Sequence, residues 1–292
     1  MADKKIALVW FKPRNVHTKE ESFQKYIETL AAKAAKIRKQ IGINYLPHQS
    51  EYIGVVGGDG PQIERAKEFA HLGIPIYGIN MGTYGFLLNN HGDNDDIRAA
   101  IEAAVWIKFP LLDIEIEYLD GSIDKTLAFN DLYTKTSGVQ TAKHRVFVNG
   151  ENIIPQVFDD RETFAMGDAV IVCSAGGSTA YNRAAGGKVF SPNAKVFGIT
   201  IASPFPIPFK PIQVPDTSEV VIEVLEDEKR QHMIIADNEA YTDVRKVTIR
   251  KSELTVTLGF KPGETHQDKV KKMEQNLRAW KKKAQENGGQ NA

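Results

Sequence analysis

The chain has 292 residues, 42% of them hydrophobic and 25% charged, and its 37 basic residues balance its 37 acidic ones. This composition predicts a globular protein of one large or two ordinary domains and excludes a disordered chain. The neutral balance removes any whole-chain argument for a nucleic acid or an anionic membrane as partner. The single cysteine, Cys173, excludes an internal disulfide framework and a multi-cysteine zinc site. Neither a membrane span nor a signal peptide is expected, so a cytoplasmic location is predicted.

Strand-like and helix-like segments alternate over the first third of the chain. Short apolar runs predict buried strands, and apolar residues at every third or fourth position predict helices. The expected strands are 6–11, 52–56 and 74–79, and the expected helices are 18–40, 61–72 and 95–107. The apolar stripe of the first helix consists of Phe23, Ile27, Leu30, Ala34 and Ile37. Gly73 is the expected C-cap of the second helix and Asn94 the expected N-cap of the third. This alternation predicts a parallel sheet with helices on both faces.

The pattern changes near Pro110. Residues 112–118 alternate apolar and charged side chains, which predicts a half-exposed antiparallel strand. Asp120-Gly121 predicts a turn before a return strand at 127–134. The remaining short segments are predicted as strands at 144–148, 168–173, 194–201, 219–224, 232–236, 247–250 and 254–258, with one helix at 178–186. Strands at this density indicate a sheet-rich second domain. The expected domains are therefore 1–108 and 109–262, followed by a tail at 263–292.

The tail predicts a basic amphipathic helix. Val270, Met273, Leu277 and Trp280 form an apolar stripe at spacings of three, four and three, and lysines and an arginine surround it. The simpler interpretation is a helix that packs on its own protein and ends in a frayed segment. A nucleic-acid or membrane surface is the alternative, although basic amphipathic helices are a weak signal for either.

A glycine-rich loop, Gly57-Gly58-Asp59-Gly60, follows the second predicted strand and precedes a helix opened by Pro61. Glycines at this place bring backbone N–H groups close to an anion, and the helix adds its positive N-terminal end. A carboxylate is out of place in a simple phosphate cradle. Asp59 fits a site where it binds a metal ion or accepts a proton from a hydroxyl. The alternative is that Asp59 merely N-caps the helix.

Three other places carry polar or aromatic residues that suggest a ligand. Phe86 lies in a second glycine-containing loop, where it would wall in a ring or simply belong to the core. Asn130 and Asp131 interrupt an apolar, Thr-rich strand, so they need partners such as a bound adenine or amide group, unless they face water at a strand end. Asp237, with Asn238, ends a predicted strand and is also explained by a hairpin turn.

The densest signal runs from Gly167 to Asn182 as a strand, a loop of small residues and a helix start. Ser178 or Thr179 is expected to cap this helix and to present hydroxyl and N–H groups to a ligand. Cys173 falls in or near the buried strand, where it is expected to act as a small hydrophobic residue rather than as a nucleophile.

Taken together, these segments resemble the NAD kinase family over roughly residues 4–260. The match lies in the order of several motifs rather than in any single one. The segments that carry it are Gly57-Gly58-Asp59-Gly60, the N-x-G-x-x-G-F segment at 80–86, Asn130-Asp131, Gly177-Ser178-Thr179-Ala180-Tyr181 with Ala185-Gly186-Gly187 after it, the proline-containing segment 204–218, and Asp237.

The resemblance implies an enzyme that phosphorylates the 2′-hydroxyl of the adenosine ribose of NAD, giving NADP. It implies ATP or polyphosphate as donor and a divalent cation, expected to be Mg²⁺. The implied fold is an α/β N-terminal domain, with a Rossmann-like parallel sheet and flanking helices, followed by a β-sandwich-like C-terminal domain. Asp59 would be the base or metal-orienting carboxylate, and Gly58 and Gly60 would approach phosphates. The other implied binding residues are Phe86 at the adenine, Asn130 and Asp131 at the adenosine, and Asp168, Ser178, Thr179, Ala180, Tyr181 and Asp237 along the rest of the dinucleotide.

The chain departs from the family pattern at five positions: Pro61, Thr83, Asp131, Met166 and Asn238. Several of these changes would weaken phosphate contacts, so they leave open the donor and the turnover rate. Two alternatives therefore stay beside the kinase: a weakly active NAD- or NADP-binding sensor, and a lipid or small-alcohol kinase that shares the GGDG loop. No nucleic-acid or membrane partner is expected. The resemblance implies a homo-oligomer, a dimer or a tetramer, and exposed strand edges offer a way to pair subunits.

Overall fold

The computed structural model describes residues 4–10, 20–42, 44–82, 85–92, 94–136, 141–154, 163–205, 208–225 and 232–288. The chain forms two compact units. Unit 1 contains Met1–Arg65, Ile74–Ile107 and Thr257–Ala292, and unit 2 contains Ala66–Gly73 and Lys108–Val256. The domain limits expected from the sequence at residues 108 and 262 stay a prediction.

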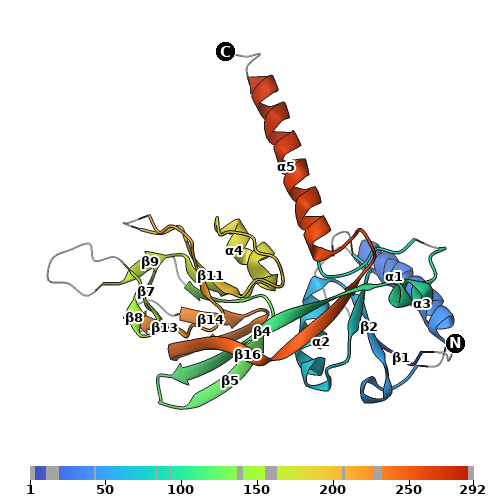
Figure 1. The fold of residues 1–292 in the computed structure, drawn as a ribbon, viewed down its shortest axis with the longest axis horizontal. Helices are drawn as coiled ribbons and strands as arrows, with labels where there is room; N and C mark the ends of the chain where they lie inside the picture. The colour runs from blue at the N-terminus through green and yellow to red at the C-terminus, as the bar shows by residue number, and fades with distance from the viewer. Residues whose placement is uncertain are drawn as a thin grey trace. The chain divides into compact units, whose positions relative to one another are not determined.

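Unit 1 is built on a parallel sheet (Figure 1). Its strands are β1 (Ile6–Trp10), β2 (Tyr52–Gly57), β3 (Ile76–Asn80) and the end of β16 (Val244–Phe260). Its helices are α1 (Glu20–Ile41), the start of α2 (Asp59–Phe69), α3 (Ile97–Glu102) and α5 (His266–Gly288), with a short 3₁₀ turn at Pro47–Gln49. Gly57 at the end of β2 is in register with Asn80 at the end of β3. The loops that follow these two strands therefore begin at the same sheet edge.

The core of unit 1 lies between this sheet and two helices. Ile37 and Ile41 of α1, with Ile97 and Ile101 of α3, are buried against side chains of the strands. Ile37 was expected on the buried face, and this is confirmed. The side chains of Phe23, Ile27 and Leu30 lie outside the described residues, as do Phe11 and the expected helix start at 18 and 19.

Two helix ends in this part of the chain test the sequence interpretation. Gly73 adopts a left-handed φ of 65° after a 3₁₀ turn at Ala70–Leu72, so the expected C-cap is confirmed. The helix expected over 95–107 is wrong at both ends. It covers only Ile97–Glu102, and its N-cap is Asp96, whose carboxylate accepts from the Ala99 N–H at 3.1 Å. Val105 begins a strand, since this β-branched and aromatic run pairs within a sheet.

Unit 2 contains a six-stranded sheet and a second set of strands that belongs to the same ten-stranded sheet as the strands of unit 1. One sheet has the order β12-β11-β10-β6-β14-β15, and its neighbouring strands are antiparallel. These strands are β12 (Ile212–Pro215), β11 (Val196–Ala202), β10 (Ala169–Cys173), β6 (Asp131–Thr136), β14 (His232–Ala236) and β15 (Glu239–Thr242). The second set is β4 (Val105–Tyr118), β5 (Ile123–Ala128), β7 (Ala142–Val148), β8 (Glu151–Asn152), β9 (Ala165–Gly167), β13 (Val220–Leu225) and most of β16.

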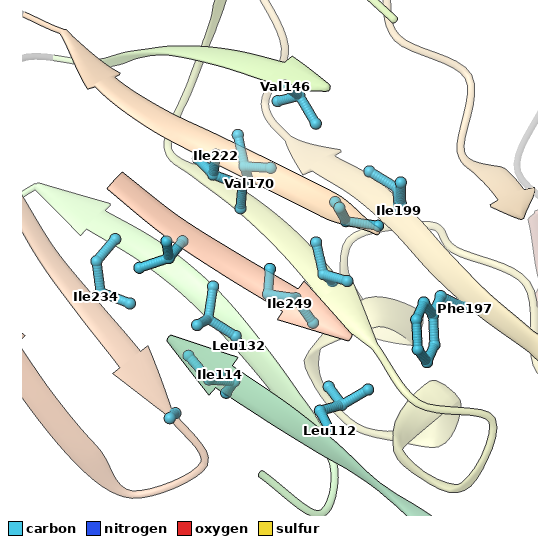
Figure 2. Close-up of a cluster of buried hydrophobic side chains, with 14 of the residues drawn as sticks. Leu112, Ile114, Leu132, Val146, Val170, Phe197, Ile199, Ile222, Ile234 and Ile249 are labelled. Atoms are coloured by element: carbon cyan, nitrogen blue, oxygen red, sulfur yellow. The ribbon is translucent and has the colours of Figure 1, made fainter. Parts of the chain in front are cut away.

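A single hydrophobic cluster joins the two sets of strands (Figure 2). Leu132 and Val170 come from the six-stranded sheet, and Leu112, Val146 and Ile222 come from the other set. Burying both inner faces in one layer is what defines a sandwich. The sequence prediction of an α/β part followed by a sheet-rich, sandwich-like part is therefore confirmed.

Three predicted elements of unit 2 need correction. The return strand at 127–134 is two strands, because the chain leaves β5 at Ala128 and enters the other sheet as β6 at Asp131. The strands at 247–250 and 254–258 are parts of one strand, β16. The helix at 178–186 is a 3₁₀ turn at Gly176–Thr179 followed by a short α4 (Tyr181–Ala184).

The C-terminal helix α5 forms as predicted (Figure 1, red). The expectation that its whole apolar stripe packs on the protein is wrong, because Leu277 is 42% and Trp280 is 65% exposed. Within the described part of the chain, no helix is long and apolar enough to cross a membrane.

Candidate active site

Asp59 is the first residue of α2, and one residue, Gly58, separates it from the end of β2. Its Oδ2 accepts from the Phe86 N–H and its Oδ1 from the Leu87 N–H, both at 2.8 Å. The alternative that Asp59 merely caps its own helix does not account for these two long-range bonds. Each carboxylate oxygen can accept a further hydrogen bond, so the group is held in place and still has lone pairs available for a ligand.

The loop after β3 is held by two asparagines. Asn80 accepts from the Gly82 N–H at 3.0 Å and donates to the Asn90 side chain at 2.7 Å. Asn89 donates to the carbonyls of Gly78 and Gly259 at 3.0 and 2.8 Å. Thr83 lies outside the described residues. These bonds fix both ends of the segment that presents its N–H groups to Asp59.

Phe86 and Gly58 differ in how much room surrounds them. The Phe86 ring is half-buried and meets His266 edge-to-face, with ring centroids 4.9 Å apart. A Cβ placed on Gly58 would meet no atom of the described residues within 4 Å, so the backbone there leaves room for a ligand. Gly60 lies in the first turn of α2. The sequence-predicted residues Gly58, Asp59, Gly60 and Phe86 therefore all belong to unit 1.

In unit 2, Asp237 holds the point where the chain changes sheets. Its carboxylate accepts from the N–H groups of Phe129 at 2.7 Å, Asn130 at 2.8 Å and Asp131 at 3.4 Å. Asp237 sits in the turn between β14 and β15 with a left-handed φ of 53°, so the hairpin interpretation is also correct. Lys67, which the sequence did not single out, places its Nζ 3.5 Å from Asp237.

Asp131 is a buried acid without a full set of partners. It is only 4% exposed, and among the residues that the structure describes its Oδ2 has no hydrogen-bond partner. Burial raises the pKa of Asp131 to about 7, and the nearby Asp237 carboxylate adds to the rise, while a backbone bond from Tyr181 opposes it. Burial also raises the pKa of Asp237, against its backbone bonds and Lys67. Near neutral pH the Asp131 side chain can therefore donate a hydrogen bond as well as accept one.

Replacing Asp131 by asparagine should stabilise the protein at alkaline pH. The folded-state pKa near 7 exceeds the ordinary value of 3.8, so the folded state binds an extra proton between these pH values. Stability therefore falls as pH rises through this window, and the full penalty persists above it. An asparagine side chain cannot ionise, and urea melts of Asp131→Asn should show a gain of about 2–4 kcal/mol at pH 8 that shrinks at pH 5. Asp113→Asn, on an exposed position of β4, is the control; equal gains at both pH values would contradict this prediction.

The loop from Gly177 to Tyr181 packs against the backbone at Asn130, directly before β6. A Cβ on Gly177 would lie 1.9 Å from the Asn130 carbonyl oxygen, so only glycine fits. Ser178 is fully buried, and its hydroxyl donates to the Ala175 carbonyl and accepts from the Phe190 N–H. The expectation that Ser178 or Thr179 caps the helix is wrong. The N-cap of α4 is Ala180, which makes no side-chain cap bond.

The remaining predicted residues are partly open. Thr179, Ala180 and Tyr181 are half-buried, and the Tyr181 ring meets Tyr133 edge-to-face at 5.0 Å between centroids. Asp168 is exposed, and its charge contributes to the raised pKa of Tyr181 after burial. Unit 2 thus brings together Asn130, Asp131, Asp168, Asp237 and the segment from Ser178 to Tyr181.

Two further residues shape this part of unit 2. Asn182, which the sequence analysis left unassigned, donates to the Ser178 and Lys188 carbonyls at 3.1 and 2.9 Å and accepts from Thr200 at 2.7 Å. It ties the loop to β11. Cys173 is buried, and burial raises the pKa of its thiol to about 12, so it is the small hydrophobic residue that the sequence predicted.

Comparison with known proteins completes the assignment. The chain matches the ATP-NAD kinase N-terminal domain over residues 11–106 and the ATP-NAD kinase C-terminal domain over 119–258. It is 30% identical over 225 residues to a protein named NAD kinase from Rickettsia bellii, covering 76% of this chain and 84% of that one. It is 28% identical over 246 residues to a NAD kinase from Xanthomonas campestris, covering 83% and 92%.

Two solved structures share the fold. Yeast NADH kinase complexed with NADH has a TM-score of 0.68 at 18% identity, covering 94% of this chain and 87% of that one. A NAD kinase from Archaeoglobus fulgidus in complex with ATP has a TM-score of 0.63 at 20% identity, covering 90% and 96%. The family that the motifs suggested is thereby confirmed, and this chain belongs to the ATP-NAD kinase family.

Proposed function

We propose that this protein transfers the terminal phosphoryl group of ATP to the 2′-hydroxyl of the adenosine ribose of NAD, forming NADP. One observation carries the proposal. In a chain of the ATP-NAD kinase family, the Asp59 carboxylate lies at the start of α2, is fixed by two backbone N–H groups and can accept a further hydrogen bond. Family membership does not favour the alternatives of a sensor or a lipid kinase.

Asp59 would act on the acceptor hydroxyl. Phosphoryl transfer depends mainly on in-line positioning and on neutralising charge, with modest acid–base help. A base must lie within hydrogen-bond reach of the proton that it takes, and its geometry must be fixed beforehand. The Phe86 and Leu87 N–H groups supply that fixation, so a free lone pair on Asp59 would accept the proton of the 2′-hydroxyl.

A divalent cation fits this site only as a companion of the nucleotide. Among the described residues, no group of three or more His, Cys, Asp or Glu side chains could hold a metal ion. Mg²⁺ in kinases commonly keeps several waters and binds one or two carboxylates together with substrate phosphates. We therefore propose Mg²⁺ held by the ATP phosphates and Asp59, where it would neutralise charge on the transferred group.

The residues of unit 2 would bind the dinucleotide in two ways. Asn130, Asp168, Thr179, Ala180 and Tyr181 are half-buried or exposed, and Asp131 has a carboxylate oxygen without a partner among the described residues, so these six residues would contact it directly. The side chains of Ser178 and Asp237 are hydrogen-bonded to the protein's own backbone. Asp237 would therefore act by holding the backbone at Asn130, and Ser178 by holding the loop from Gly177 to Tyr181. This division separates contact residues from those that shape the surface.

The function is tested by mixing the purified protein with Mg²⁺, ATP and NAD and reading NADP with an NADP-specific dehydrogenase. Parallel reactions replace ATP by polyphosphate or NAD by NADH, with NADPH measured in the latter. NADP formed with ATP and abolished by chelating Mg²⁺ supports the proposal. A protein that forms no NADP or NADPH with either donor would contradict it, and saturable NAD binding by that protein would favour the sensor.

We also propose that the protein works in the cytoplasm as a homo-oligomer, a dimer or a tetramer. Support comes from the edge strands β12 and β15 of the six-stranded sheet, which can pair with a second copy. Light scattering coupled to size-exclusion chromatography measures the mass directly. A mass equal to that of one 32.5 kDa chain at micromolar concentration would contradict this part of the proposal.

Gly58→Ala should separate binding from stability. The added methyl group meets nothing within 4 Å in the part of the chain that the structure describes, so the melting temperature should change by less than about 2 °C. A phosphate that approaches the Gly58 backbone would instead meet the methyl group, and the KM for ATP or NAD should rise about tenfold. Kinetics and thermal melts check both parts, and an unchanged KM for both substrates would show that no phosphate approaches here.

A further inference from the structure

The first turn of α5 lies beyond both regions that match the family, the second of which ends at residue 258. This turn is nevertheless in direct contact with the segment that holds Asp59. The Lys269 Nζ donates to the carbonyls of Gly85 at 3.2 Å, Phe86 at 3.2 Å and Leu88 at 2.5 Å. A single ammonium group therefore binds three carbonyls within four consecutive residues.

Lys269 and Asp59 bind opposite sides of the same backbone segment. The Phe86 and Leu87 N–H groups point to the Asp59 carboxylate, while neighbouring carbonyls, including that of Phe86, point to the Lys269 ammonium. A cation at the carbonyl end and an anion at the N–H end both favour this orientation of the peptides. Turning the segment over would break both sets of bonds, so the two side chains fix it jointly.

The surroundings of Lys269 are built to keep it there. Thr265 and Asp268 form a reciprocal capping box at the start of α5, since each accepts from the backbone N–H of the other, at 3.3 and 3.0 Å. His266 is fully buried with its ring against Phe86. Burial lowers the pKa of Lys269, and the charges of Asp59 and Glu264 oppose that shift. Three carbonyl acceptors compensate for this partly desolvated ammonium.

We propose that Lys269 is a positioning residue for Asp59, so that the C-terminal helix helps to hold the proposed base within unit 1. Its ammonium holds the segment 85–88 in the orientation that places the Asp59 carboxylate for the acceptor hydroxyl. The inference rests on the proposed NAD kinase function, because it concerns how the base of that reaction is held.

The test compares Lys269→Met with Lys269→Arg and with Lys272→Met. Lys269→Met keeps the length and the apolar part of the side chain but loses the charge and the donors. Lys269→Arg restores both. Lys272 is exposed on the same helix, so Lys272→Met controls for losing a lysine of α5. The measurements are kcat, the KM for NAD and the melting temperature of each full-length protein.

We expect Lys269→Met to lower kcat about 10- to 100-fold while the KM for NAD changes less than about threefold, because a misplaced base slows chemistry more than binding. Lys269→Arg should recover much of the loss, and Lys272→Met should match the wild type. If Lys269→Met does not fold, Lys269→Gln, which keeps a short amide donor without charge, should show the same fall in kcat.

Two results would overturn the inference while leaving the function intact. One is an active wild type with unchanged kcat in the folded Lys269→Met or Lys269→Gln protein. The other is an equal loss of kcat in Lys269→Met and Lys269→Arg, which would show that shape rather than charge matters. A wild type that forms no NADP or NADPH is a different result, because it overturns the proposed function and this inference with it.

Discussion

Asp59→Asn is expected to lower kcat for NADP formation by about 10²- to 10⁴-fold, the range that a positioned general base contributes. Asparagine keeps the size of the side chain but has one acceptor oxygen in place of two. One of the N–H groups of Phe86 and Leu87 would then face an NH₂ group, which donates rather than accepts. The substitution therefore removes the base and disturbs the loop that positions it.

The stability cost of Asp59→Asn should be small beside this effect. Losing one charge-assisted hydrogen bond at a half-buried site costs about 1–3 kcal/mol, so the variant should fold. The KM for NAD should change only a few-fold, since the dinucleotide contacts proposed in unit 2 remain. Asp124→Asn, at an exposed position of β5, controls for loss of an acidic residue. A kcat within tenfold of wild type in Asp59→Asn would exclude Asp59 as the base.

The sequence predicted those parts of the fold and the site that depend on patterns among neighbouring residues. The strand at 232–236 was predicted with its observed limits because alternating burial needs only neighbouring residues. The GGDG loop was placed at the end of β2 because glycines after an apolar run mark a strand-to-helix turn. Such signals are contained within a few neighbouring residues.

The parts that the sequence did not predict depend on contacts between distant residues. Asp237 binds N–H groups that lie 106 to 108 positions before it, and Lys269 binds carbonyls 181 to 184 positions before it. Neither a turn residue such as Asp237 nor a lysine on an amphipathic helix such as Lys269 indicates by its local sequence which distant backbone groups it binds. The switch of the chain between sheets at Phe129 and Asn130 was missed for the same reason, because the sequence of residues 127–134 gives no local sign that the strand is divided there.

Asp59 and Asp237 share a structural device that follows from these contacts. Each carboxylate accepts two or more consecutive backbone N–H groups of a distant segment, Phe86 and Leu87 in one case and Phe129 to Asp131 in the other. Bonds from backbone N–H groups to an ionised acceptor are stronger than neutral ones. Each acid thereby fixes a loop whose sequence alone would leave its conformation open.

Gly177→Ala is expected to destabilise the protein strongly. The methyl carbon would lie 1.9 Å from the Asn130 carbonyl oxygen and 2.4 Å from its Cα. Both atoms belong to the backbone, so no change of side-chain rotamer relieves the clash, and the strand and the loop must move apart. Overpacking of this severity costs about 3 kcal/mol or more, equivalent to a fall in melting temperature of roughly 6–12 °C.

The displacement of the strand and the loop should also weaken binding of the dinucleotide, because Asn130 and Asp131 are proposed contacts and Asp237 holds their backbone. The KM for NAD should rise at least tenfold in the fraction that folds, measured below the lowered melting temperature. Gly92→Ala is the matched control: among the described residues its Cβ would meet only Asp95, at an ordinary 3.5 Å, and it should melt within about 2 °C of wild type. If Gly177→Ala melted with that control, the loop would not pack on Asn130 in solution, and the arrangement of the binding residues in unit 2 would have to be redrawn.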